Sequence, residues 1–169
     1  MKSTQETEYK SVRTLIAEQS EKYGNKPYMV SIDQADKTLS FEALFRLGNS
    51  MAQFFAERGL KANDRILLLA ENSIEFIAVF LGVQRCGGTI ATANVEMNRS
   101  HISEILHAVN PSLVLAQDGL GLEELQDPNM STEWMSLGEW HQDAISSGFF
   151  QKISNYPDDK DLDEVCSAD

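Results

Sequence analysis

Three residues on one short stretch have the types that bind metal ions. His101, Glu104 and His107 lie in a segment that hydrophobic spacing predicts to be a helix. His101 and Glu104 share a face, but His107 lies about 120° further round the helix, so the three side chains do not converge on one ion. We therefore interpret them as solvated surface and predict no metal site.

A glycine-rich stretch, Asp118-Gly-Leu-Gly-Leu-Glu-Glu124, follows a predicted strand and opens a predicted short helix. That context is typical of a dinucleotide-binding fingerprint. The third glycine of the fingerprint is missing, because Glu124 stands at its position and its carboxylate would repel a pyrophosphate. A simple glycine turn is therefore favoured over a nucleotide site.

The sequence itself predicts no catalytic residue. No serine lies in a nucleophile-elbow context, no cysteine has a histidine partner indicated by the sequence, and no phosphate-binding loop of the Walker type is present. Arg85 ends a predicted buried helix just before Cys86-Gly87-Gly88. In that position a cation stabilises the last carbonyl groups of the helix.

Length and charge narrow the classes of function. The chain has 169 residues, 42% of them hydrophobic, which fits one folded domain. It carries 26 acidic side chains against 14 Lys and Arg, and this net charge of -12 argues against nucleic acid and anionic membranes as partners. The apolar run from Ile74 to Val83 is too short to span a membrane. Two cysteines, Cys86 and Cys166, favour a reduced cytoplasmic setting.

The charge is distributed unevenly along the chain. Residues 1–99 carry twelve basic and twelve acidic side chains, whereas residues 100–169 carry two basic and fourteen acidic ones. We therefore predict a βαβ core over residues 1–116 and an acidic segment over residues 117–169. One alternative for the function is a non-catalytic α/β interaction module that binds a basic partner through residues 118–169.

Hydrophobic patterning predicts the elements that position these residues. The nearly all-apolar run at 65–70 has no alternation, which is typical of a central parallel strand. Predicted strands begin near residues 66, 89 and 112, and their equal spacing with helices between them predicts a βαβαβ unit with a parallel sheet. Before it, a polar turn at 33–36 predicts a small N-terminal hairpin. The fold class is therefore α/β with flanking helices. Strands are expected at 28–32, 38–41, 65–70, 89–93 and 112–116, and helices at 9–23, 41–58, 73–85, from Ser100, at 119–125, and from a capping box at 136–139 to about 147.

Four segments in this order resemble the start of adenylate-forming (AMP-binding) enzymes. They are Thr38-Leu-Ser-Phe-Glu-Ala-Leu44, Leu60-Lys-Ala-Asn-Asp-Arg-Ile-Leu67, Glu71-Asn-Ser-Ile-Glu-Phe76 and Phe80-Leu-Gly-Val-Gln-Arg-Cys-Gly-Gly-Thr-Ile-Ala-Thr-Ala-Asn94. The ending Ala-Thr-Ala-Asn94 is most similar to the branch that holds coumarate-CoA ligase and firefly luciferase. The resemblance covers residues 12–116 and identifies the chain as an incomplete part of the large N-terminal domain of such an enzyme.

The resemblance implies an activity and its cofactors. Members join a carboxylic acid to AMP from ATP with Mg²⁺, and most then pass the acyl group to coenzyme A. The resemblance implies that the whole protein is an acyl- or aryl-CoA ligase. The phosphate loop of the family would follow near Asp169, so this fragment alone is expected to be inactive. In some aryl-CoA ligases a basic residue at the position of Arg85 contacts the nucleotide end of CoA.

Two further expectations accompany this interpretation. The alternatives within the family are a luciferase-like enzyme and an enzyme that loads a carrier protein. The fragment itself is expected to bind none of these cofactors. It is also expected to self-associate, because a sheet cut short leaves an unpaired edge and bare apolar surface.

Overall fold

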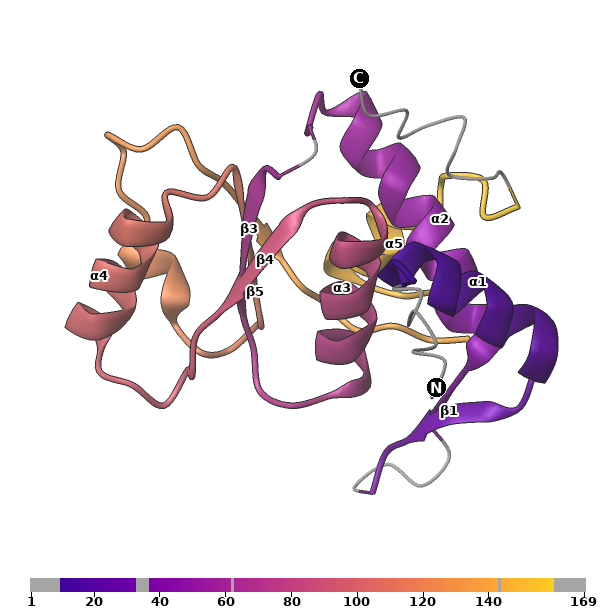
Figure 1. Ribbon diagram of the computed structural model, residues 1–169. Helices are drawn as coiled ribbons and strands as arrows, with labels where there is room; N and C mark the ends of the chain where they lie inside the picture. The colour runs from indigo at the N-terminus through magenta and orange to yellow at the C-terminus, as the bar shows by residue number, and fades with distance from the viewer. Residues whose placement is uncertain (1–9, 33–36, 62, 143, 160–169) are drawn as a thin grey trace, which may run out of the picture.

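The computed structural model describes residues 10–32, 37–61, 63–142 and 144–159, with a parallel sheet between layers of helices (Figure 1). The turn predicted at residues 33–36 lies outside the described residues. The α/β class, the parallel sheet and the small hairpin are confirmed.

The sheet is built from four parallel strands in the order β4-β3-β5-β6. Strands β3 (Arg65–Leu69) and β5 (Leu113–Ala116) are central, whereas β4 (Thr89–Thr92) and β6 (Glu133–Ser136) lie at the edges. Each residue of β3 after Arg65 is buried, as is all of β5. Runs of consecutive apolar residues are what a strand covered on both faces requires.

Alternate residues of the central strands contact different helix layers. On one face, Ile66 and Leu68 pack with α2 (Phe41–Glu57), α3 (Ile74–Arg85) and α5 (Gly148–Ile153). On the other, Leu67 and Leu69 pack with α4 (Arg99–Val109) and the 3₁₀ turn η1 (Leu122–Leu125). Figure 1 shows α4 on one side of the sheet and α2, α3 and α5 on the other. No helix in the described part is long and apolar enough to cross a membrane.

The N-terminal elements cover the outer side of α2 and α3. Helix α1 (Val12–Tyr23) packs against both helices, and β1 (Pro27–Val30) pairs antiparallel with β2 (Thr38–Ser40). The hydroxyl of Ser40 accepts a hydrogen bond from the Ala43 amide at 3.0 Å, which caps α2. Hairpin and helix therefore join without an intervening loop.

Helices α2 and α3 approach closely because two glycines lie in their contact. A Cβ atom at Gly48 would lie 2.6 Å from Cδ of Arg85, and one at Gly82 would overlap Sδ of Met51. Real side-chain atoms do not approach this closely. The two glycines thus admit the long side chains of the opposite helix.

The region after β5 differs from the sequence prediction. A fourth strand of the sheet, β6, forms where no strand was expected. The prediction of a helix up to about residue 147 is wrong, because the described residues of 137–147 form a loop and α5 begins only at Gly148. Gly138 has φ +66°, outside the helical region. The loop is closed by a hydrogen bond from the Ser147 amide to the Glu139 carbonyl and by one from the Glu139 amide to the Ser147 hydroxyl. The short helix predicted at 119–125 is the 3₁₀ turn η1.

One edge of the sheet leads to a prediction. Among the described residues β4 pairs with β3 alone, and a strand edge with unpaired backbone groups is a template for another strand. We expect the mass of the 169-residue chain, measured by light scattering, to rise with concentration. Thr92→Lys, an exposed change on this edge, should reduce this rise, whereas the equally charged control His101→Lys should not. A monomeric wild type at every concentration would contradict this prediction.

Candidate functional site

The carboxyl ends of β3, β5 and β6 meet at one end of the sheet and border a cavity of about 290 Å³. The chain leaves β3 toward α3 on one face and leaves β5 toward η1 on the other, so the topology switches between these two strands. Ligands of open parallel sheets bind at such a point. We call the cavity the strand-end crevice; it is lined by Ser31, Lys37, Glu71, Asn72, Ser73, Ile74, Glu75, Gln117, Asp118, Leu137, Gly138 and Glu139.

A reciprocal pair of hydrogen bonds joins the two central strand ends. The backbone N–H of Glu71 donates to Oε1 of Gln117 at 2.8 Å, and Nε2 of Gln117 donates to Oε2 of Glu71 at 3.2 Å. Gln117 directly follows the last residue of β5, and Glu71 lies two residues after the last residue of β3. The pair therefore fixes the distance across the topological switch.

Glu75 is a buried carboxylate that ties three segments together. Its Oε1 accepts hydrogen bonds from Nζ of Lys37, at 2.5 Å, and from the backbone N–H of Trp140, at 3.0 Å. Burial acts to raise the pKa of Glu75, but the hydrogen bonds from Lys37 and the Trp140 amide outweigh it, and the pKa lies below its ordinary value. The hairpin, α3 and the loop after β6 thus share one charged contact.

The charge of the strand-end crevice limits its chemistry. Four carboxylates line it, from Glu71, Glu75, Asp118 and Glu139, against the one ammonium group of Lys37. This lining does not fit a triphosphate, since negative charges repel each other in a confined space. Within the described ranges no group of three or more His, Cys, Asp or Glu residues is arranged to hold a metal ion. Among the described lining residues, Lys37 is therefore the one cation that faces an anionic ligand in this crevice.

The structure places the three residues of α4 on its surface. Nδ1 of His107 lies 2.7 Å from the Ser103 carbonyl, and its Nε2 lies 3.1 Å from Oδ2 of Asp127. These two hydrogen bonds raise the pKa of His107 above its ordinary value. His101 and Glu104 are exposed. The described contacts of His107 join α4 to the loop before β6, which is a structural role.

The glycine-rich stretch forms a turn whose acidic residues are engaged. Gly119 and Gly121 both have positive φ, at +79° and +59°. Oε1 of Glu124 accepts a hydrogen bond from Nε of Arg99 at 3.1 Å. Asp118 accepts one from the hydroxyl of Ser136 at 2.7 Å. The glycines supply turn geometry, and the carboxylates attach the turn to α4 and β6.

Arg85, the residue that the sequence singled out for CoA, lies inside the protein. Its side chain is 2% exposed and lies over the ring of Phe45, 4.2 Å from the ring centroid. Nη1 donates to the Arg13 carbonyl at 3.2 Å, and Nη2 donates to Oδ1 of Asn49 at 2.8 Å. The guanidinium thus joins α1, α2 and α3. A contact with CoA stays a prediction, and it requires the guanidinium to leave these partners.

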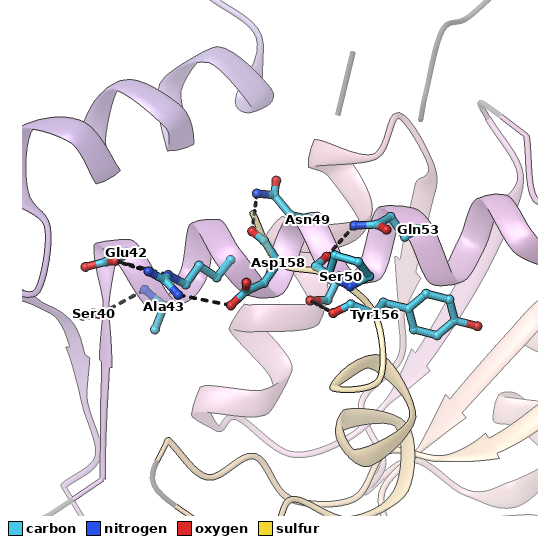
Figure 2. Close-up of polar contacts among 10 residues, drawn as sticks. Ser40, Glu42, Ala43, Asn49, Ser50, Gln53, Tyr156 and Asp158 are labelled. Carbon is cyan, nitrogen blue, oxygen red and sulfur yellow. Dashed lines mark hydrogen bonds and ion pairs between the residues drawn. The ribbon is translucent and has the colours of Figure 1, made fainter. Parts of the chain in front are cut away.

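Sequence reasoning missed a row of polar side chains on α2 that holds the end of the described chain (Figure 2). Arg46 forms an ion pair with Asp158 at 3.4 Å. The side chains of Asn49, Ser50 and Gln53 donate hydrogen bonds to the carbonyl groups of residues 158, 156 and 157. The spacing i, i+3, i+4, i+7 was visible in the sequence as a polar stripe on an otherwise apolar helix, but its partners were not.

Comparisons with known proteins agree on a family. A family model described as AMP-binding enzyme matches residues 16–162. Tyrocidine synthase 1 of Brevibacillus parabrevis is 30% identical over 135 residues, which are 80% of this chain and 12% of that protein. The chain therefore spans about an eighth of that relative.

Two solved structures share the fold. A fatty acyl CoA synthetase of Mycobacterium tuberculosis matches with a TM-score of 0.72 at 19% identity, covering 88% of this chain and 29% of that chain. The N-terminal subdomain of Klebsiella oxytoca NpsA, in complex with 3-hydroxyanthranilyl-AMSN, matches with a TM-score of 0.65 at 18% identity, covering 80% of this chain and 33% of that chain. At these identities the likeness concerns the fold alone.

The Glu75 contact predicts a pH dependence of stability. Because the folded pKa of Glu75 is lowered, its contribution is fully present above the unfolded pKa, near 4.5, and is lost as the pH falls through the folded value. At neutral pH, Glu75→Gln should lower the free energy of unfolding by about 2 kcal/mol.

Chemical denaturation at several pH values tests this prediction. The difference in the free energy of unfolding between wild type and Glu75→Gln should close as the pH falls from the unfolded pKa, near 4.5, through the lower folded pKa. The exposed change Glu104→Gln serves as the matched control and should follow the wild type. A gap that stays constant with pH would show that Glu75 is not stabilised as a carboxylate.

Proposed function

Because the chain belongs to the AMP-binding enzyme family, we propose that it forms the N-terminal segment of an adenylate-forming ligase. The complete enzyme would join a carboxylic acid to AMP from ATP and release pyrophosphate. The observation that carries this proposal is the family match over residues 16–162, which includes nearly every described element. The family uses ATP and Mg²⁺ and takes small carboxylic acids as substrates.

For the second half-reaction we propose transfer of the acyl group to coenzyme A, which makes the enzyme an acyl- or aryl-CoA ligase. The thiol sulfur of CoA would attack the acyl carbon, AMP would leave, and a thioester would form. Two observations support this choice. The ending Ala-Thr-Ala-Asn94 is most similar to the branch that holds coumarate-CoA ligase and firefly luciferase, and a fatty acyl CoA synthetase has the same fold.

A second candidate is loading of a carrier protein. Two relatives favour this candidate. Tyrocidine synthase 1 is 30% identical to this chain, and a nonribosomal peptide synthetase of Aspergillus violaceofuscus is 32% identical. The acyl-adenylate would be the same in both cases, and the two candidates differ only in the thiol that receives the acyl group. A luciferase-like enzyme is a further alternative within the family.

The described residues contribute scaffold rather than chemistry in this proposal. The strand-end crevice is lined by carboxylates, so the groups that stabilise the transferred phosphoryl group must come from elsewhere in the enzyme. The division into a core over residues 1–116 and an acidic segment over 117–169 is retained as part of the proposal. The sparse use of cysteine supports a cytoplasmic location.

Pyrophosphate exchange tests the proposed activity. The complete protein, incubated with ATP, Mg²⁺ and labelled pyrophosphate, should incorporate label into ATP when a panel of aliphatic, aromatic and amino acids includes its substrate. The 169-residue chain alone should give none, since its described residues offer no phosphate-binding loop. Absence of exchange in the complete protein with every acid would contradict the proposal.

Supplying the thiol then separates the two acceptors. With the active acid, mass spectrometry should detect an acyl-CoA when free CoA is added, and no acyl group on a phosphopantetheinylated carrier protein. The reverse result would overturn the CoA proposal and leave the adenylation step intact. Inactive heat-treated protein provides the background for both reactions.

A further inference from the structure

The last described residues are held on α2 through their main chain. The hydroxyl of Ser50 donates to the Tyr156 carbonyl at 3.3 Å, and Nδ2 of Asn49 donates to the Asp158 carbonyl at 2.7 Å. Nε2 of Gln53 donates to the Pro157 carbonyl between them. Three consecutive carbonyl groups therefore each accept a hydrogen bond from a side chain of α2, as Figure 2 shows for the labelled residues.

This mode of contact fixes the path of the chain and not the identity of its side chains. The one ion pair in the same place, Arg46 with Asp158, joins side chains that are 54% and 45% exposed. Exposed ion pairs contribute little to stability. The hydrogen bonds to the carbonyl groups thus define where the chain lies when it leaves the described core.

Asn49 differs from its two neighbours in the row because its amide is oriented by a buried charge. The residue is 1% exposed, and its Oδ1 accepts a hydrogen bond from Nη2 of Arg85 at 2.8 Å. The guanidinium has donors and no acceptor, so the amide oxygen must face it. The amide nitrogen then faces the Asp158 carbonyl. Reversing the amide would place donor against donor on one side and acceptor against acceptor on the other.

Arg85 is itself fixed in direction. It lies over the ring of Phe45 and donates to the Arg13 carbonyl on α1. The missing side chain of Gly48 provides the space for its methylene groups. Hydrogen bonds from Arg85 to Asn49 and from Asn49 to the Asp158 carbonyl thus connect α3 to the chain at Asp158.

We propose that Arg85 and Asn49 are positioning residues that anchor the chain at Asp158 and so fix the start of the ATP-binding part of the enzyme. The second half of this statement rests on the proposed function, in which the phosphate-binding part follows residue 169. Arg85 acts from inside the protein, through the amide of Asn49, and touches no substrate in this role.

Hydrogen exchange on the 169-residue chain tests the anchor without any assumption about activity. Asn49→Asp keeps an oxygen toward Arg85 but replaces the donor to the Asp158 carbonyl by a second acceptor. The amides of Ser154, Asn155 and Tyr156 donate to carbonyl groups within α5, so their protection reports on the segment that follows this helix. In the variant their exchange should accelerate by about tenfold or more, while β3 and β5 stay protected.

Two controls sharpen the measurement. Asn98→Asp adds the same charge at the start of α4, where Asp and Asn cap equally well, and should leave exchange at 154–156 unchanged. The double variant Ser50→Ala, Gln53→Ala removes two carbonyl contacts but keeps the Arg85–Asn49 pair, and should accelerate exchange much less than Asn49→Asp. If the double variant accelerates exchange at residues 154–156 as much as Asn49→Asp does, the proposed role of Asn49 is overturned.

The outcomes of the exchange experiment are decisive. Unchanged exchange at 154–156 in Asn49→Asp, or an equal acceleration in β3 and β5, would overturn the anchor. Should Asn49→Asp unfold the core, the double variant decides alone: protection retained at 154–156 supports the anchor by Asn49, and protection lost overturns it.

Kinetics of the complete enzyme test the link to ATP. Asn49→Asp should raise the KM for ATP by about tenfold while the KM for the carboxylic acid changes less than twofold, and Asn98→Asp should leave both unchanged. An inactive wild type would refute the proposed function and leave the exchange result standing. An active enzyme in which Asn49→Asp frees residues 154–156 but keeps the KM for ATP would overturn the link to ATP binding.

Discussion

The buried guanidinium of Arg85 is the contact on which the arrangement of the helices depends. Removing a charge from water costs several kcal/mol unless the surrounding groups compensate for it. The compensation comes from the Arg13 carbonyl, the Asn49 amide oxygen and the face of Phe45. Since these groups belong to α1 and α2, the three helices satisfy the charge only when they converge. Gly48 allows that convergence, because any side chain there would occupy the space of the Arg85 methylene groups.

The neutral half of the chain holds the acidic half mainly through uncharged contacts. Ion pairs such as Arg46 with Asp158 and Arg58 with Glu133 cross between the halves, but they are largely exposed and contribute little. The stronger attachments are strand pairing of β5 with β3, the apolar contacts of α5 and the carbonyl groups held by α2. The acidic surplus therefore has little effect on folding, and it determines instead which charges a ligand near the strand ends would meet.

The elements that were predictable from the sequence are those in which local pattern and burial agree. The runs of apolar residues around 66 and 112 have no alternation, and a sheet covered on both faces is the setting that explains them. Strand β6 and the loop after it were not predictable. β6 alternates only weakly over four residues, and the loop is held by Glu75, which lies 65 residues from Trp140. The role of Arg85 was also hidden, because a basic residue at a helix end is consistent with capping, with ligand binding and with burial.

The distribution of polar contacts suggests why this part of the fold can be similar in enzymes with different substrates. Its buried polar groups bind one another or the backbone: Arg85 binds Asn49 and a carbonyl, and Glu75 binds Lys37 and an amide. Turning one of these buried groups toward a ligand costs free energy, because the buried group that it leaves loses its hydrogen-bond partner. A scaffold of this kind keeps its geometry while residues outside it change. In the proposed enzyme, the contribution of this part to adenylation is to hold the path of the chain, and the choice of acid and thiol is assigned to residues that are not committed to the core.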